Sequence, residues 1–107
     1  MIVKISDVFS NTPGARFESE GPNSGEKFRK EILLPKYLEA KKNGENLVIN
    51  LDDCYGFATS FLEEAFGGLV RELKEKNILN KIEIVSMDDA TAETLIKKYV
   101  REAEEKL

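Results

Sequence analysis

Two adjacent hydroxyl residues, Thr59 and Ser60, occupy the position in this sequence best suited to a chemical modification. They follow an apolar run at residues 47–51 and directly precede a segment in which apolar residues recur with helical spacing. Glu63 lies three residues after Ser60, so this pair fits a capping box, in which each side chain accepts a hydrogen bond from the other's backbone amide. We therefore expect a helix over residues 60–76 with Ser60 at its start.

The same position would also suit a phosphate group. Free amides and the positive end of the helix dipole stabilise an anion at a helix start. Phosphorylation of Ser60, or of Thr59 as the second candidate, would add about 1.5 to 2 negative charges there. Hydroxyl caps are common at helix starts in general, so the spacing alone favours an ordinary cap over a phosphoacceptor.

Residues around the hydroxyl pair are candidates for contact with a partner protein. Tyr55 and Phe57 flank Gly56 in the preceding loop, where aromatic side chains could anchor a partner or equally close the end of the core. Asp52 and Asp53 are consecutive, and consecutive side chains point to opposite sides of an extended chain, which favours solvated charges over a cation site. The candidate partner-binding residues are Asp53, Tyr55, Phe57, Phe61 and Glu64.

The composition argues against several kinds of catalytic chemistry. The sequence has no histidine and one cysteine, Cys54, which excludes an internal disulfide, a cysteine-pair metal site and histidine-based catalysis. Acidic and aromatic neighbours would not lower the pKa of Cys54, so we interpret it as a half-buried structural residue. No nucleophile is paired with a base in the sequence. We expect a protein that is not an enzyme, with no cofactor and no metal.

Length and charge indicate a single domain that binds neither nucleic acid nor membrane. The 107 residues are 41% apolar and 34% charged, as in ordinary globular proteins. The 16 basic and 20 acidic residues are mixed throughout, so no cationic stripe exists that could neutralise several phosphates. Residues 1–7 resemble neither a signal peptide nor a membrane span. We expect one domain over 1–107 and a cytoplasmic location.

Strands and helices alternate in the hydrophobic pattern. Residues 1–5, 47–51 and 81–85 are predicted strands, and residues 16–20 could form a short additional strand. The nearly continuous apolar run at 47–51 is typical of a central strand with helices on both faces. Such alternation predicts an α/β fold with parallel strand pairs.

Three helices are predicted, and their ends carry capping residues. The first begins near Asn23 or Ser24, kinks or restarts at Pro35 and ends at Gly44. The last covers residues 90–106, with Asp88 or Asp89 as its cap. Within the middle helix, adjacent glycines at 67–68 indicate close approach of another backbone, for which packing against the sheet is favoured over a partner helix.

Three segments carry a resemblance to a known family. They are Asn-Ser-Gly-Glu-Lys-Phe-Arg at 23–29, Val-Ile-Asn-Leu-Asp at 48–52, and the run from Tyr55 to Val70 that contains the hydroxyl pair and the two glycines. These segments resemble a STAS-like family of uncharacterised bacterial proteins similar to anti-sigma factor antagonists. The resemblance implies a central mixed sheet of about four strands with about three helices.

The resemblance also implies a regulatory role. In anti-sigma factor antagonists, a histidine-kinase-like ATPase phosphorylates a serine at a helix start and thereby abolishes binding. Ser60 aligns with that serine and Thr59 with its neighbour, although Ala58 stands where an aspartate is common and Phe61 where a glycine is common.

The expected function is therefore a non-catalytic regulatory domain that docks on a histidine-kinase-like ATPase or another regulator and is switched by phosphorylation. The alternative is a sensory or scaffolding module that binds a small ligand or a sister domain without phosphorylation. The sequence leaves self-association open.

Overall fold

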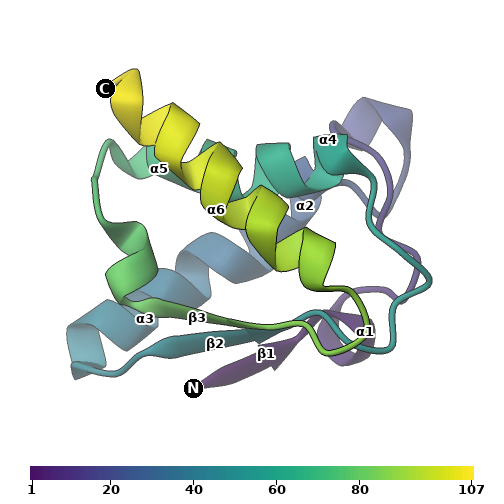
Figure 1. The fold of residues 1–107 in the computed structure, drawn as a ribbon, viewed down its shortest axis with the longest axis horizontal. Helices are drawn as coiled ribbons and strands as arrows, with labels where there is room; N and C mark the ends of the chain where they lie inside the picture. Colours follow the sequence, from purple (N-terminus) through teal and green to yellow (C-terminus); the bar gives the residue numbers. More distant parts are fainter.

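A three-stranded parallel sheet forms the base of the protein, whose residues 1–107 are all described by a computed structural model (Figure 1). The strands are β1 (Ile2–Lys4), β2 (Leu47–Asn50) and β3 (Ile82–Val85). They lie in the order β1-β2-β3, with both pairs parallel. The strands predicted at 1–5, 47–51 and 81–85 are confirmed, whereas the predicted mixed sheet of about four strands is corrected to a parallel sheet of three.

Three long helical units follow the strands. A one-turn helix α1 (Ile5–Val8) and a short 3-10 helix η1 (Glu18–Glu20) precede the first of them, and a second 3-10 helix η4 (Ile78–Asn80) precedes β3. The first long unit consists of α2 (Gly25–Phe28), η2 (Arg29–Leu33) and α3 (Leu34–Asn43). The second consists of α4 (Thr59–Leu62), η3 (Glu63–Gly67) and α5 (Gly68–Leu73). The third is the single helix α6 (Ala90–Glu105). None of these helices combines the length and the apolar character needed to cross a lipid bilayer.

The predicted short strand at 16–20 is wrong. Its place is taken by η1 and by a loop whose carbonyl groups serve the start of α2. The amide of Gly25 donates to the Ala15 carbonyl at 2.8 Å, and that of Glu26 donates to the Arg16 carbonyl at 3.0 Å. Because these carbonyls satisfy helix-start amides, they are not available to a strand ladder.

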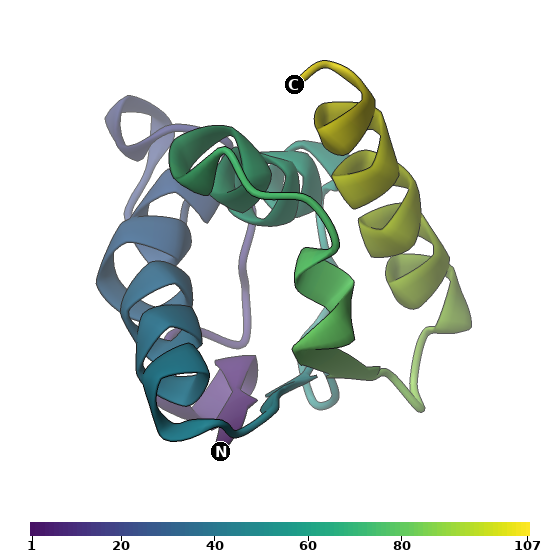
Figure 2. The same cartoon turned by 90° about the vertical axis from the view of Figure 1, so that its left-hand side faces the viewer.

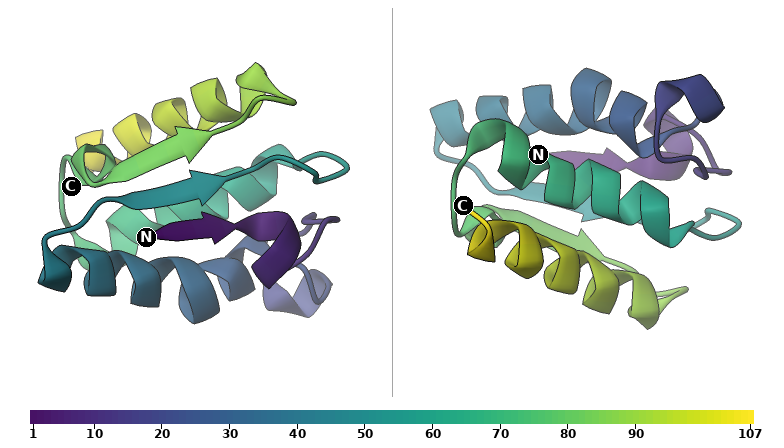
Figure 3. Two further views of the ribbon diagram at one scale, coloured as in Figure 1. Left: turned by 90° about the horizontal axis from the view of Figure 1, so that it is seen from below. Right: turned by 90° about the horizontal axis from the view of Figure 1, so that it is seen from above.

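All three long helical units cover the same face of the sheet (Figures 2 and 3). In β2, Leu47 and Ile49 are fully buried beneath them, whereas Val48 and Asn50 on the other face are only half-buried. Ile2 of β1 lies opposite Val48 in the register and is 73% exposed. The expectation that helices cover both faces of the central strand is therefore wrong. Side chains along β2 alternate between the face that the helices cover and a face that is open to solvent.

The helix ends agree in part with the predicted caps. Ser24 rather than Asn23 caps α2, since its hydroxyl accepts from the Lys27 amide at 3.1 Å. Asp89 caps α6 by accepting from the Thr91 amide at 2.9 Å. The first unit restarts as α3 with Pro35 in its first turn, and it ends at Gly44 in the left-handed conformation with φ of 67°.

The first two helical units approach so closely that glycine is required on both. A Cβ atom at Gly25 would lie 2.5 Å from the carbonyl oxygen of Phe61. A Cβ atom at Gly68 would overlap the guanidinium group of Arg29. The close approach predicted at the two glycines is therefore not to the sheet: Gly68 faces the side chain of Arg29, and Gly67 faces the carboxylate of Glu63 in its own helical unit. Both units widen into a π-turn at this crossing, η2 in one and η3 in the other.

Aromatic side chains fill the core where these helices meet α1. Phe28 and Phe61 are fully buried, with ring centroids 5.8 Å apart. Phe9 meets Phe28 edge-on at 5.4 Å, and Phe57 lies 5.9 Å from Phe61. These distances are in the favourable range for aromatic pairs, so the cluster stabilises the crossing beyond its buried area.

We expect Gly25→Ala to lower the free energy of unfolding by about 1–3 kcal/mol, because the new methyl group would force the two helical units apart. Urea denaturation followed by circular dichroism measures this change. Gly14→Ala is the matched control, since the nearest atom to its Cβ would be 3.9 Å away, and its effect should stay within about 0.5 kcal/mol. Equal stability of the two variants would contradict the close crossing.

Candidate functional site

The hydroxyl pair lies at the start of α4, but the cap is a different residue. Ala58 is the N-cap, and its carbonyl accepts from the amide of Phe61 at 3.0 Å. Thr59 is the first helical residue and is exposed, while Ser60 is the second and is half-buried. The predicted capping box between Ser60 and Glu63 is therefore wrong, and Ser60 has no capping role.

The Glu63 carboxylate is instead held by two arginines. Arg71, eight residues further along the same unit, donates to it through two nitrogens at 2.7 and 3.1 Å. Arg16, from the loop before η1, donates at 2.6 Å. These bonds, first that of Arg71 and then that of Arg16, lower the pKa of Glu63 despite an opposing effect of burial. Glu63 therefore joins the first loop to the second helical unit.

Glu64 forms the most buried ion pair of the molecule, with Arg29. The Arg29 Nη1 atom lies 2.5 Å from Glu64 Oε2 and 2.8 Å from the Glu64 carbonyl oxygen, while its Nε donates to Glu72 at 3.0 Å. Burial lowers the pKa of Arg29, but the hydrogen bonds and charges of Glu64 and Glu72 outweigh it and raise the pKa overall. Glu64 is 8% exposed, so it is not a surface residue that a partner could contact.

The aromatic candidates differ in accessibility. Phe61 is fully buried in the aromatic cluster and Phe57 is half-buried against it, so Phe61 belongs to the core and Phe57 closes its end. Tyr55, by contrast, is 85% exposed. Of the five residues predicted to contact a partner, Phe61 and Glu64 point inward, while Tyr55 and Asp53 are at the surface.

Polar contacts tie the loops after the three strands together. Lys4 at the end of β1 pairs with Asp53 after β2 at 2.5 Å. The amide of Asp53 donates to the Asp88 carboxylate after β3 at 3.0 Å, and the Asp88 amide donates to Asp52 at 2.9 Å. Asp53 has a left-handed conformation with φ of 67°. The adjacent carboxylates at 52 and 53 thus serve as acceptors that hold neighbouring loops in place.

Cys54 lies in the same loop and is half-buried. Burial, and then the charge of Asp53, raises the pKa of its thiol, so the protonated form dominates at neutral pH. Its sulfur lies 3.7 Å from the carbonyl oxygen of Ser10, and the next amide, of Tyr55, donates to the Asn11 carbonyl at 2.8 Å. These contacts attach the loop to the segment after α1.

Three of the most exposed apolar side chains of the protein project from these joined segments. Val8 follows β1 and is 54% exposed, Tyr55 follows β2, and Met87 follows β3 and is 85% exposed. The carboxyl ends of parallel strands meet at one edge, so the three segments that carry these residues follow the strands at the same end of the sheet (Figures 1 and 3). We call Val8, Tyr55 and Met87 the carboxyl-edge surface; the loop that carries Tyr55 leads directly to Thr59.

Sequence reasoning identified Tyr55 but missed Val8 and Met87. Met87 stands alone between Ser86 and Asp88, and Val8 stands between Asp7 and Phe9, and both come within three residues of the end of a predicted strand. Exposed single apolar residues are common in proteins, and only the parallel order of the strands brings these together. The sequence feature that could have identified Val8 and Met87 is therefore their position after predicted strands, and not their residue type.

Comparison with known proteins gives one family. A family model described as "STAS-like domain of unknown function (DUF4325)" matches residues 24–92, which run from the cap of the first long helical unit into α6. This match agrees with the resemblance found in the sequence. No curated protein and no solved structure matches the chain.

We expect removal of one partner of the buried ion pair to be more harmful than removal of both. Arg29→Met should lower the free energy of unfolding by about 3 kcal/mol, because Glu64 Oε2 would lose its partner and only the longer contacts of Oε1 to Arg16, at 3.5 Å, and to Arg71, at 3.9 Å, would remain. Arg29→Met combined with Glu64→Leu should lose less than the single variant, since no isolated charge remains. Urea denaturation of both variants measures the difference.

The exposed pair of Lys36 and Glu39, 3.6 Å apart on α3, provides the control. Lys36→Met should change stability by no more than about 1 kcal/mol, because surface ion pairs contribute little. A double variant at 29 and 64 that is less stable than Arg29→Met would contradict the expectation that the charge left on Glu64 is the main cost of the single substitution.

Proposed function

We propose, from the premise that this chain belongs to the family of STAS-like domains of unknown function, that it is a non-catalytic regulatory domain that binds a partner protein. The contact we assign is the carboxyl-edge surface. The observation that carries the proposal is the exposure of Val8, Tyr55 and Met87, which come from three different segments that follow the strands at one end of the sheet.

The rigidity of the carboxyl-edge surface supports this role. The ion pair of Lys4 with Asp53, the hydrogen bond from the Asp53 amide to Asp88 and that from the Asp88 amide to Asp52 join the three segments. A partner that binds ordered loops loses less conformational entropy than one that binds mobile loops. Tyr55 and Met87 are also residue types that are enriched at protein interfaces.

For the partner, we propose a histidine-kinase-like ATPase or a related regulator, as the resemblance to anti-sigma factor antagonists implies. The same resemblance makes Ser60 the phosphoacceptor, with Thr59 as the second candidate. Thr59 is the more accessible of the two in the structure. Both follow the loop of Tyr55, from which Thr59 is four residues and Ser60 five residues away in the sequence.

A phosphate would change the local electrostatics in a definite way. Ser60 precedes Glu63 by three residues and Glu64 by four, so these side chains share one side of the helix. A phosphate on Ser60 would repel both carboxylates and compete with Glu63 for Arg16. We propose that this added charge weakens the docking of the partner.

A second candidate function is supported by a hollow between the second helical unit and α6. It has a volume of about 390 Å³ and is lined by Glu63, Arg71, Tyr99, Glu102, Ala103 and Lys106. Charged groups of both signs surround one aromatic ring in this hollow. A sensory or scaffolding module that binds a small polar ligand there, without phosphorylation, is the alternative.

Substitution of Tyr55→Ser together with Met87→Ser tests the carboxyl-edge surface. Wild-type protein, immobilised and exposed to lysate of its native host, should retain a histidine-kinase-like ATPase identified by mass spectrometry, and the double variant should lose it. Leu38→Ser on α3 is the control, because Leu38 is 45% exposed but lies on another element. Retention of the ATPase by the double variant would contradict the proposed contact.

Phosphorylation is tested with the purified protein, the captured ATPase and ATP, followed by intact-mass and peptide mass spectrometry. We expect one phosphate on Ser60 or Thr59, weaker binding of the double glutamate variant, and normal binding of the double alanine variant. Ser60→Ala should change stability by less than about 0.5 kcal/mol, because Ala58 rather than Ser60 caps the helix. An unmodified protein would favour the module without phosphorylation.

A further inference from the structure

Strand β3 lies at an edge of the sheet and has unpaired backbone groups. The amide of Leu47 donates to the Lys81 carbonyl at 2.7 Å, and that of Leu51 donates to the Val85 carbonyl at 2.8 Å. In a parallel ladder, alternate residues bond to the same neighbour, so residues 81, 83 and 85 face β2. The amide and carbonyl groups of Ile82 and Ile84 therefore point away from the sheet, toward its free edge.

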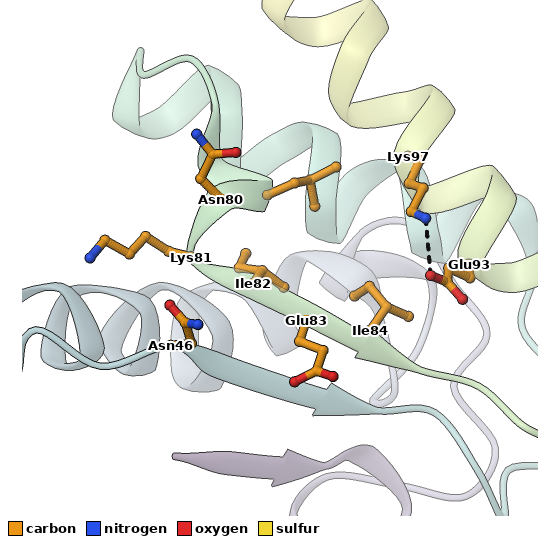
Figure 4. A pocket seen from close by; sticks show the side chains of 9 residues that line it. Asn46, Asn80, Lys81, Ile82, Glu83, Ile84, Glu93 and Lys97 are labelled. Carbon is orange, nitrogen blue, oxygen red and sulfur yellow. Dashed lines mark ion pairs between the residues drawn. The ribbon is translucent and has the colours of Figure 1, made fainter.

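A hollow of about 430 Å³ lies beside this edge (Figure 4). Leu79, Ile82 and Ile84 supply its apolar surface, and Glu93 and Lys97 of α6 line its other side. These two α6 residues form an ion pair with each other at 3.1 Å. The hollow thus combines unpaired backbone groups, apolar side chains and a helical wall. Peptides that add a strand to a sheet use such backbone groups for affinity and side-chain pockets for specificity.

The charged side chains along the edge of β3 follow a fixed order, with a basic residue before an acidic one. Lys81 stands at the N-terminal end of β3, and Glu83 is exposed in the middle of the strand. Neither side chain forms an ion pair within the chain, in contrast to Glu93 and Lys97. A strand that runs antiparallel to β3 would meet these charges with a basic residue opposite Glu83 and an acidic residue near Lys81. Opposite charges on neighbouring strands stabilise their pairing.

We propose that the free edge of β3 binds an extended peptide segment of a partner protein, which adds a fourth, antiparallel strand beside α6. The segment has the pattern apolar–basic–apolar–acidic. Its apolar residues pair with Ile84 and Ile82 and enter the hollow, its basic residue faces Glu83, and its acidic residue reaches Lys81. This binding edge is separate from the carboxyl-edge surface and does not depend on the proposed function.

A second copy of this chain does not fit the same edge. Two copies joined through β3 in one continuous antiparallel sheet would have both α6 helices on the same face. Helix α6 lies on the outer side of β3, beyond the strand's edge (Figures 2 and 3). Paired strands are about 4.8 Å apart, whereas packed helices need about 8–10 Å between axes. The two α6 helices would collide, which leaves an isolated peptide strand as the occupant.

The proposal is tested with a blocked synthetic peptide, Thr-Val-Lys-Ile-Glu-Val-Thr, and with amide hydrogen exchange measured by NMR. Saturating peptide should slow exchange at the amides of Ile82 and Ile84 at least about tenfold, because these gain hydrogen bonds, and should leave the amides of Glu83 and Val85 unchanged. The same peptide with proline in place of isoleucine lacks a central donor and should give no protection.

A charge exchange tests the direction of the strand. The peptide with lysine and glutamate exchanged should bind about tenfold more weakly by fluorescence anisotropy, since two favourable pairs become unfavourable. The protein variant Lys81→Glu with Glu83→Lys should reverse this preference. Circular dichroism of the variant shows that it is folded.

Three outcomes would overturn the proposal. The first is unchanged exchange at Ile82 and Ile84 with every peptide. The second is tighter binding of the charge-exchanged peptide to the wild-type protein, which would indicate a parallel strand. The third is protection of these amides that grows with protein concentration in the absence of peptide, since a second copy would then occupy the edge.

Discussion

The ion pair between Arg29 and Glu64 is the interaction on which the arrangement of the helices depends. It joins the first two helical units at a point where both are widened into π-turns, and it is possible only because Gly68 leaves space for the guanidinium group. Arg29 also donates to the Glu64 carbonyl, so it bonds to backbone as well as to charge. Removal of charges from water offsets much of the attraction within a buried ion pair, so the pair is weak evidence for added stability.

Much of the fold could be predicted from local patterns. Residues 47–51 and 81–85 have the β-branched and apolar content of strands, and residues 90–105 have clear helical spacing with a cap at Asp89. The short strand at 16–20 could not be judged locally, because the carbonyls of Ala15 and Arg16 bond to the start of α2. The sequence also contains no indication that one face of β2 is open to solvent, since Val48 on that face is as apolar as its buried neighbours.

The site was harder to predict than the fold, because its contacts join residues that are far apart in sequence. Glu64 is a partner-binding candidate in the sequence, yet it is buried against Arg29, which lies 35 positions earlier. The spacing of Glu63 from Ser60 predicts a capping box, but two arginines hold the Glu63 carboxylate, one of them 47 positions away. Spacing within a helix identifies possible local bonds, and it does not identify the stronger distant partners that replace them.

The order of strands in the sheet has a consequence for how the chain folds. Because β1, β2 and β3 are neighbours in the order of synthesis, the first two strands and the helical unit between them can associate before β3 has been made. In that intermediate Arg29 has no Glu64 to neutralise it, and its guanidinium group must remain hydrated. The part of the first helical unit around Arg29 can therefore lose its bound water only when the second helical unit supplies Glu64, so these two units reach their native packing together.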